Sequence, residues 1–152
     1  MPFSIEHLRG LPSPFYRVTF RALIFNDENE LLVFRNKEGF WELPGGGWEH
    51  AESIEQSISR EVGEEIGASV ESIAEIIAVW SSMNSKYGYM QLRIGVRVKL
   101  RDYDFVPSGE ADEVRFVGKK EFLALPLEIW EAGAKEQADI LWVENIRSTN
   151  GK

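Results

Sequence analysis

Three glutamates, Glu61, Glu64 and Glu65, lie close together in a segment that is rich in acid. Residues 42–75 contain nine glutamates and one basic residue, Arg60. On a helix, at about 100° per residue, the three carboxylates share one face, and Glu65 overlaps the edge of the apolar side. Like charges three and four positions apart repel, and partial burial raises the cost. A hard divalent cation would offset this repulsion. Ligands that are all oxygen favour Mg²⁺, with Mn²⁺ as the alternative, over zinc.

A glycine triplet, Gly45-Gly46-Gly47, comes before these acids in the sequence. Glycine lets the backbone approach a ligand where a Cβ atom would clash. The triplet is not a phosphate-binding P-loop, because no Gly-Lys-Ser/Thr follows it. It is not an EF-hand either, because the D-x-D-x-D-G pattern is missing. Followed by the single Glu52, then Arg60 and the three acids, it indicates a binding site rather than a plain flexible turn.

The acids must be positioned by a helix over residues 54–66. Ser53 and Gln56 fit the S-x-x-Q capping box, which places the N-cap at Ser53. Gly67 stands where a left-handed C-terminal cap is needed. Apolar residues recur every four positions between the two caps, at Ile54, Ile58, Val62 and Ile66.

The segment Gly45–Ala68, which reads GGGWEHAESIEQSISREVGEEIGA, resembles the Nudix box. That motif is glycine, five residues, Glu, seven residues, Arg-Glu, an aliphatic residue, any residue, Glu-Glu, any residue, Gly and an aliphatic residue. Every polar and glycine position matches at the right spacing, and only Ala68 is smaller than the usual aliphatic residue. The matching positions are Gly46, Glu52, Arg60, Glu61, Val62, Glu64, Glu65, Gly67 and Ala68.

The resemblance implies an α/β fold, a Nudix-type α/β/α sandwich around a mixed β-sheet. It also implies Mg²⁺-dependent hydrolysis of a nucleoside diphosphate linked to another group. Carried over by position, Glu61, Glu64 and Glu65 would bind the metal ion, together with the Gly45 carbonyl. Glu52 would pair with Arg60 and hold the glycine loop against the helix.

Members of the family commonly use one more acid from outside the box. We expect it in the loop 102–113, as Glu110 or Glu113, because both come directly before or within the short strand predicted at 113–117. For contacts to the substrate we single out Gly46, Gly47, Arg35, Trp48 and Tyr87. The aromatic side chains could stack on a base and Arg35 could contact phosphate, but core packing for the aromatic residues and a solvated strand position for Arg35 are the more common uses of such residues.

The remaining elements are read from hydrophobic periodicity. Strands are predicted at 15–25 and 31–34, joined as a hairpin by the turn cluster 26–29, and a short strand runs from residue 40 into the glycine loop. Further strands are predicted at 73–81, 89–100 and 113–117, and a helix at 128–141. We expect an irregular lead-in over 1–14, a single Nudix hydrolase domain over 15–147 and a flexible tail over 148–152.

Composition sets limits on the function. The chain has 152 residues, about one domain, and 17 basic against 25 acidic residues give a net charge of −8. This charge disfavours stable binding to nucleic acid or to anionic membranes. No cysteine is present, which excludes disulfides, thiolate zinc sites and a cysteine nucleophile. We expect a cytoplasmic protein that binds a small nucleotide, without a membrane partner, and we leave a homodimer open.

The substrate stays open at this stage. Met83 stands where ADP-ribose hydrolases of the family often have a proline, and the absence of cysteine excludes the isopentenyl diphosphate isomerases that share the fold. Two alternatives to a nucleotide pyrophosphohydrolase remain. One is a Nudix-fold sensor that binds a nucleotide-sugar without cleaving it, although such proteins tend to lose box glutamates. The other is an RNA 5′-end pyrophosphohydrolase, which would need a local basic patch, for example from Arg93, Arg97, Lys99 and Arg101.

Overall fold

The computed structural model describes residues 15–84, 88–106 and 109–150. Seven strands and five helical segments follow one another along this part of the chain. In order they are β1 (Tyr16–Leu23), β2 (Leu31–Asn36), β3 (Trp41–Glu42), β4 (Gly45–Gly47), α2 (Ile54–Ile66), β5 (Val70–Asn84), β6 (Tyr89–Leu100), β7 (Ala111–Val117), α3 (Lys119–Ala124), the 3₁₀ helix η1 (Ile129–Glu131), α4 (Ala132–Glu136) and α5 (Ala138–Asn150).

The strands form two sheets. The larger sheet has four strands in the order β4-β1-β6-β5, and the smaller has three in the order β3-β2-β7. In the larger sheet β1 and β6 run parallel, with Thr19 opposite Arg93, while their outer neighbours pair antiparallel. The mixed sheet that was expected is therefore confirmed, and the second sheet is an addition to it.

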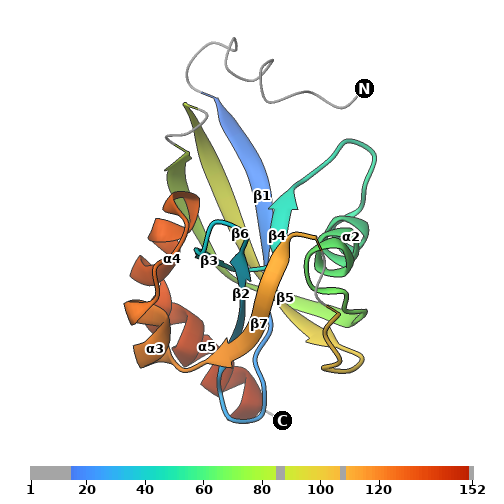
Figure 1. Cartoon of the computed structure of the whole chain (residues 1–152), viewed down its shortest axis with the longest axis vertical. Helices are drawn as coiled ribbons and strands as arrows, with labels where there is room; N and C mark the ends of the chain where they lie inside the picture. Colours follow the sequence, from blue (N-terminus) through green and yellow to red (C-terminus); the bar gives the residue numbers. More distant parts are fainter. Residues whose placement is uncertain (1–14, 85–87, 107–108, 151–152) are drawn as a thin grey trace.

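Helices cover both sides of the sheets, with α2 on one side and α3, α4 and α5 on the other (Figure 1). Two separate apolar cores result, because alternate residues of a strand point to opposite faces. Phe20 and Ala22 of β1 belong to the core under α2, and Leu23 belongs to the core under the C-terminal helices. The α2 core includes Ile58, Val62 and Ile66, and the other core includes Trp80, Phe122, Leu141 and Trp142.

Three local expectations are changed by the structure. The turn after β1 forms, with the Asn26 amide donating to the Glu30 carbonyl at 3.0 Å, but β1 and β2 then enter different sheets instead of a hairpin. The glycine triplet is itself the edge strand β4, paired with β1. The region 128–141 is not one helix but η1, α4 and the start of α5, and α5 continues to Asn150.

Candidate active site

The predicted helix is confirmed as α2, and both of its ends are capped as expected. The Ser53 side chain accepts from the Gln56 amide, and the Gln56 side chain accepts from the Ser53 amide at 2.8 Å. Gly67 ends the helix in the left-handed conformation, with a φ of 67°. These caps fix where α2 begins and ends, and so fix which face carries the three glutamates.

Arg60 and Glu52 form a two-pronged ion pair that ties the glycine loop to α2. The Arg60 Nε atom donates to Glu52 Oε1 at 2.9 Å, and Nη2 donates to Oε2 at 3.3 Å. Arg60 Nη1 also lies 2.9 Å from Glu61 Oε1 and 3.5 Å from Glu64 Oε2. The pairing of Glu52 with Arg60 that the resemblance implies is therefore present in the structure.

Glu65 is the most buried of the three acids, with 6% of its surface exposed. Its Oε1 atom accepts from the Gly45 amide at 2.8 Å, which joins α2 directly to β4. Burial raises the pKa of Glu65 well above its ordinary value, and the Glu61 charge raises it further. Burial also raises the pKa of Glu61, although Arg60 works in the opposite direction. Two neighbouring carboxylates are thus held where their charges are costly.

Gly46 faces the carboxylate of Glu61 with no room for a side chain. A Cβ atom at Gly46 would overlap the Glu61 carboxylate, so the glycine lets this acid lie directly against the strand backbone. Gly45 has a φ of 146°, which an L side chain rarely adopts. Glycine is therefore required here for close approach between β4 and α2 rather than for flexibility.

Glu61, Glu64 and Glu65 offer a suitable donor set for a hard divalent cation. All their ligand atoms are carboxylate oxygens, and burial makes the negative charges of Glu61 and Glu65 costly, as their raised pKa values reflect. Within the described ranges, however, no three His, Asp or Glu side chains already converge closely enough to hold a metal ion. Arg60 binds Glu61 and Glu64, so a cation bound by these two side chains would have to compete with it.

The two candidate outer acids lie in different surroundings. Glu110 lines a cavity of about 590 Å³ together with Glu65 and Glu42. Glu113 pairs with Arg35 at 3.4 Å and lies on the face of β7 opposite to Val114, which packs on the α2 side. Glu110 is thus brought to the acidic site, and Glu113 and Arg35 are not.

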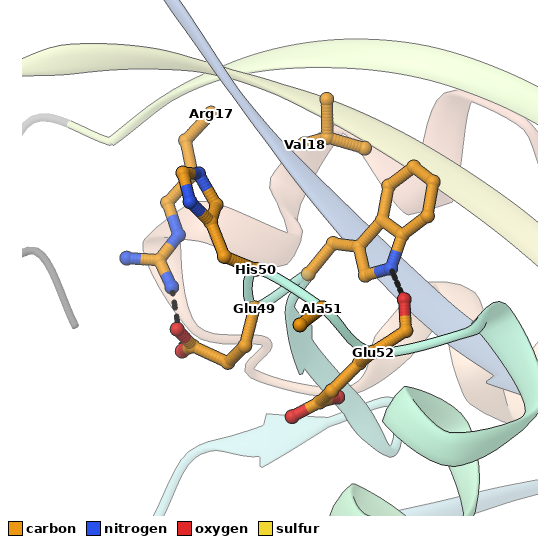
Figure 2. Close-up of a pocket in the computed structure, with 7 residues that line it drawn as sticks. Arg17, Val18, Glu49, His50, Ala51 and Glu52 are labelled. Carbon is orange, nitrogen blue, oxygen red and sulfur yellow. Dashed lines mark hydrogen bonds and ion pairs between the residues drawn. The ribbon is translucent and has the colours of Figure 1, made fainter. Parts of the chain in front are cut away.

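The residues that were predicted to contact the substrate lie in different places. Trp48 lines a surface groove of about 480 Å³ beside the glycine strand. Figure 2 shows other residues of this groove, with the Arg17 side chain directed toward the Glu49 carboxylate, 3.5 Å away, and His50 beside them. The Trp48 Nε1 atom donates to the Glu52 carbonyl at 3.0 Å, and its ring meets Phe20 edge-on. Gly46 and Gly47 line a second, smaller pocket of about 180 Å³. Tyr87 lies outside the described residues.

Sequence reasoning missed a buried charged cluster behind the glycine strand. Glu131 of η1 accepts from Arg21 Nε at 2.6 Å and from the Leu43 amide at 3.1 Å, and lies 3.5 Å from Arg93. Nearby, Glu42 accepts from the Trp130 indole at 3.0 Å. Only alternation within strands marks Arg21 and Arg93 as inward-facing, and nothing in the sequence pairs them with Glu131.

The basic residues that an RNA-binding patch would need do not gather. Arg93 is buried, Arg97 binds Glu75 at 2.7 Å, and Lys99 binds Glu71 at 2.9 Å. No helix in the described part of the chain is both long and apolar enough to cross a membrane.

Comparison with known proteins agrees with this geometry. The profile of the NUDIX domain matches residues 15–138. Among solved structures, an ADP-ribose pyrophosphatase from Streptococcus suis 89-1591 is 21% identical, with a TM-score of 0.69 over 86% of this chain and 92% of that one. A MutT protein from Methanosarcina mazei Go1 is 24% identical, with a TM-score of 0.70 over 93% and 100%. A UDP-X diphosphatase is 24% identical, with a TM-score of 0.65 over 92% and 70%. The comparison with curated proteins finds no match.

A fold with helices on both faces of a mixed sheet, and a capped helix carrying three glutamates against a glycine strand, defines a hydrolase of phosphorus-containing anhydrides. The chain belongs to the Nudix family. Hydrolases of this family generally need a divalent metal ion.

Proposed function

We propose that the protein is a Mg²⁺-dependent pyrophosphohydrolase that cleaves the phosphoanhydride bond of a nucleoside diphosphate linked to another group. A nucleoside triphosphate or a nucleotide-sugar has such a bond. The observation that carries the proposal is the pair of neighbouring carboxylates, the buried Glu65 and the half-buried Glu61, held against the backbone of Gly45 and Gly46. Folding alone gains nothing from placing two like charges there.

Each residue of the site has a role in this proposal. Glu61, Glu64 and Glu65 would hold the metal ion, which when bound neutralises phosphoryl charge and activates water. Arg60 and Glu52 are positioning residues, because their ion pair holds the loop that follows β4 against α2. Glu110 is the outer acid that the cavity geometry favours, since it shares a cavity with Glu65.

The experiment is a product-release screen with the full chain and Mg²⁺ or Mn²⁺. The panel contains nucleoside triphosphates, ADP-ribose, nucleotide-sugars and dinucleoside polyphosphates. We expect at least one of them to be cleaved, and we expect excess EDTA to abolish cleavage. Two variants prepared in the same way serve as controls for contaminating phosphatases: Glu61→Gln should be inactive, and Glu55→Gln, an exposed glutamate of the same helix, should be active. Full turnover in EDTA, or no cleavage of any substrate, would contradict the proposal.

A sensor that binds without cleaving is the competing function, and the same screen separates the two. All the box glutamates are retained here, and Glu65 and Glu61 meet β4 as a site for chemistry requires. Saturable binding of a nucleotide-sugar without any product would favour the sensor.

A further inference from the structure

One end of the larger sheet carries a polar pocket on the face opposite to α2. Elsewhere this face is apolar, with Leu23 and Trp80 in the core under the C-terminal helices. The pocket has a volume of about 180 Å³, and Trp130 is among the residues that line it. Its lining residues come from β1, β4, β5, β6 and η1, and they are Arg17, Thr19, Arg21, Gly46, Gly47, Asn84, Tyr89, Gln91, Arg93 and Trp130.

Arg93 forms the floor of this pocket and is fully buried, with a side-chain exposure of 1%. Its Nη2 atom donates to Gln91 Oε1 at 2.6 Å and to the Trp130 carbonyl at 2.7 Å. Its Nη1 atom is buried without a hydrogen-bond partner, and Glu131 at 3.5 Å is its nearest counter-charge. Burial and the neighbouring Arg21 lower the pKa of Arg93 to about 9. Glu131 balances the charge at this atom, so Arg93 is held by protein groups and acts on the pocket through the residues that it orients.

The contact with Arg93 also fixes which way the Gln91 amide points. An arginine side chain has donors only, so the Gln91 oxygen must face it. The Gln91 NH₂ group is thereby directed away from Arg93, as a donor. Gln91 is itself buried, with 6% of its surface exposed, so this orientation is held by packing as well.

Hydrogen-bond donors and aromatic rings both line the pocket. Gln91 provides a donor, Arg17 provides another while also lying 3.5 Å from Glu49, and Tyr89 and Trp130 provide the rings. None of the described residues that line the pocket is acidic; Glu131, which balances Arg21 and Arg93, is not among them. Flat apolar walls suit an aromatic ring, and the donors suit ring oxygens.

The pocket lies one strand away from the carboxylates of α2. Gly46 and Gly47 line it, while Gly46 also faces Glu61. Because β4 is the edge strand of its sheet, no further strand separates the pocket from the α2 side there. Gly46 therefore adjoins both the pocket and the Glu61 carboxylate.

We propose that Gln91, oriented by Arg93, makes this pocket a subsite for a nucleobase that carries ring carbonyl groups, as uracil and hypoxanthine do. Cytosine and adenine are disfavoured, because an amino group replaces the carbonyl and meets a donor. This inference rests on the proposed function, because it takes the base as part of a nucleotide substrate whose remaining groups would extend to α2.

The test uses pairs of substrates whose bases differ in one exocyclic group and in the proton on the neighbouring ring nitrogen. UTP with CTP, and ITP with ATP, each exchange a carbonyl for an amino group. With the full chain and Mg²⁺ we expect kcat/KM to favour the carbonyl member by about tenfold or more, because a site built to hydrogen-bond one group rejects its analogue. The variant Gln91→Glu replaces the donor with an acceptor that still pairs with Arg93, and it should reduce that ratio about tenfold. Gln91→Met, which has no donor, should bring the ratio close to one if the first variant does not fold.

The control is Gln137→Glu, which makes the same change outside the pocket and should leave the ratio unchanged. Calorimetric binding of UMP against CMP, and of IMP against AMP, in EDTA gives a readout that needs no catalysis. Equal binding within each pair, or no binding at all, overturns the inference even if the enzyme is active. A clear preference without turnover of any substrate keeps the subsite and overturns the proposed function. Competition by orthophosphate alone, without preference among the bases, would make the pocket a phosphate site and also overturn the inference.

Discussion

Replacing Glu65 with glutamine should separate the activity of this enzyme from its stability. The side chain keeps its size, and the amide oxygen can still accept from Gly45 at the 2.8 Å contact. What is lost is a buried negative charge next to that of Glu61. The change thus removes a proposed metal ligand and, in the metal-free protein, a source of repulsion.

The two effects have different sizes. Loss of one charged ligand worth roughly 3–5 kcal/mol in the transition state lowers the rate by about 10²–10⁴. Relief of repulsion between residues four apart on a helix is worth a few tenths of a kcal/mol when exposed, and more when buried. For a domain of this size each kcal/mol shifts Tm by about 2–4 °C, so we expect the metal-free variant to melt about 1–3 °C higher.

The pH dependence of the melting difference follows from the raised pKa of Glu65. A carboxylate whose pKa is higher in the folded state binds more protons when folded, so its cost is present above the folded pKa and disappears as the pH falls. The advantage of Glu65→Gln in EDTA should therefore be largest near pH 8 and vanish as the pH approaches the ordinary range of a glutamate.

The assay is thermal melting in EDTA over this pH range, with steady-state kinetics in Mg²⁺. Glu55→Gln is the matched control, because it is the same substitution at an exposed position in the first turn of α2, where negative charge is favourable. This control variant should leave the rate unchanged and should not raise the Tm. If Glu65→Gln melts several degrees lower and keeps its activity, Glu65 is a structural residue and the reasoning is wrong.

Three further predictions concern single positions. Gly46→Ala should lower kcat more than tenfold with little change in Tm, because its Cβ displaces only the flexible end of Glu61; Gly118→Ala, where a Cβ meets nothing, is the control for both measurements. Ser53→Ala should lower the free energy of unfolding by about 1 kcal/mol in urea titration, because the helix loses its N-cap, and an unchanged value would mean that the capping box contributes nothing. Glu110→Gln should reduce kcat and Glu113→Gln should not, since only Glu110 shares the cavity of Glu65. If both variants keep the wild-type kcat, this loop takes no part in the reaction.

The part of the site that is local in sequence was predictable. The capping box at Ser53, the spacing of the isoleucines and the end at Gly67 together specify α2, and the structure has the same bounds. Once the helix is fixed, the shared face of Glu61, Glu64 and Glu65 follows from its geometry. The Glu52–Arg60 pair followed from the family resemblance rather than from the residues themselves.

The part that depends on distant contacts was not predictable. Periodicity identifies β1 and β2 as strands, but it does not say that they enter different sheets. Glu131 lies in a segment that reads as one helix, and the structure breaks it, turning Glu131 toward Arg21 and Leu43. Glu110 and Glu113 look alike in sequence, but Glu110 precedes β7 and Glu113 lies within it, opposite Arg35 of β2, and this difference is known only once the bounds and pairing of β7 are known.

The Glu131 contacts have a consequence for how the enzyme is made. Synthesis proceeds from the N-terminus, so the ribosome releases β1, the glycine strand and α2 well before residue 131. Until then Arg21 and Arg93 lack the carboxylate that balances them in the folded core. A nascent chain that already contains the complete family motif thus lacks the Glu131 carboxylate that pairs with Arg21 and Arg93. We therefore expect the active enzyme to form only when the last third of the chain has emerged.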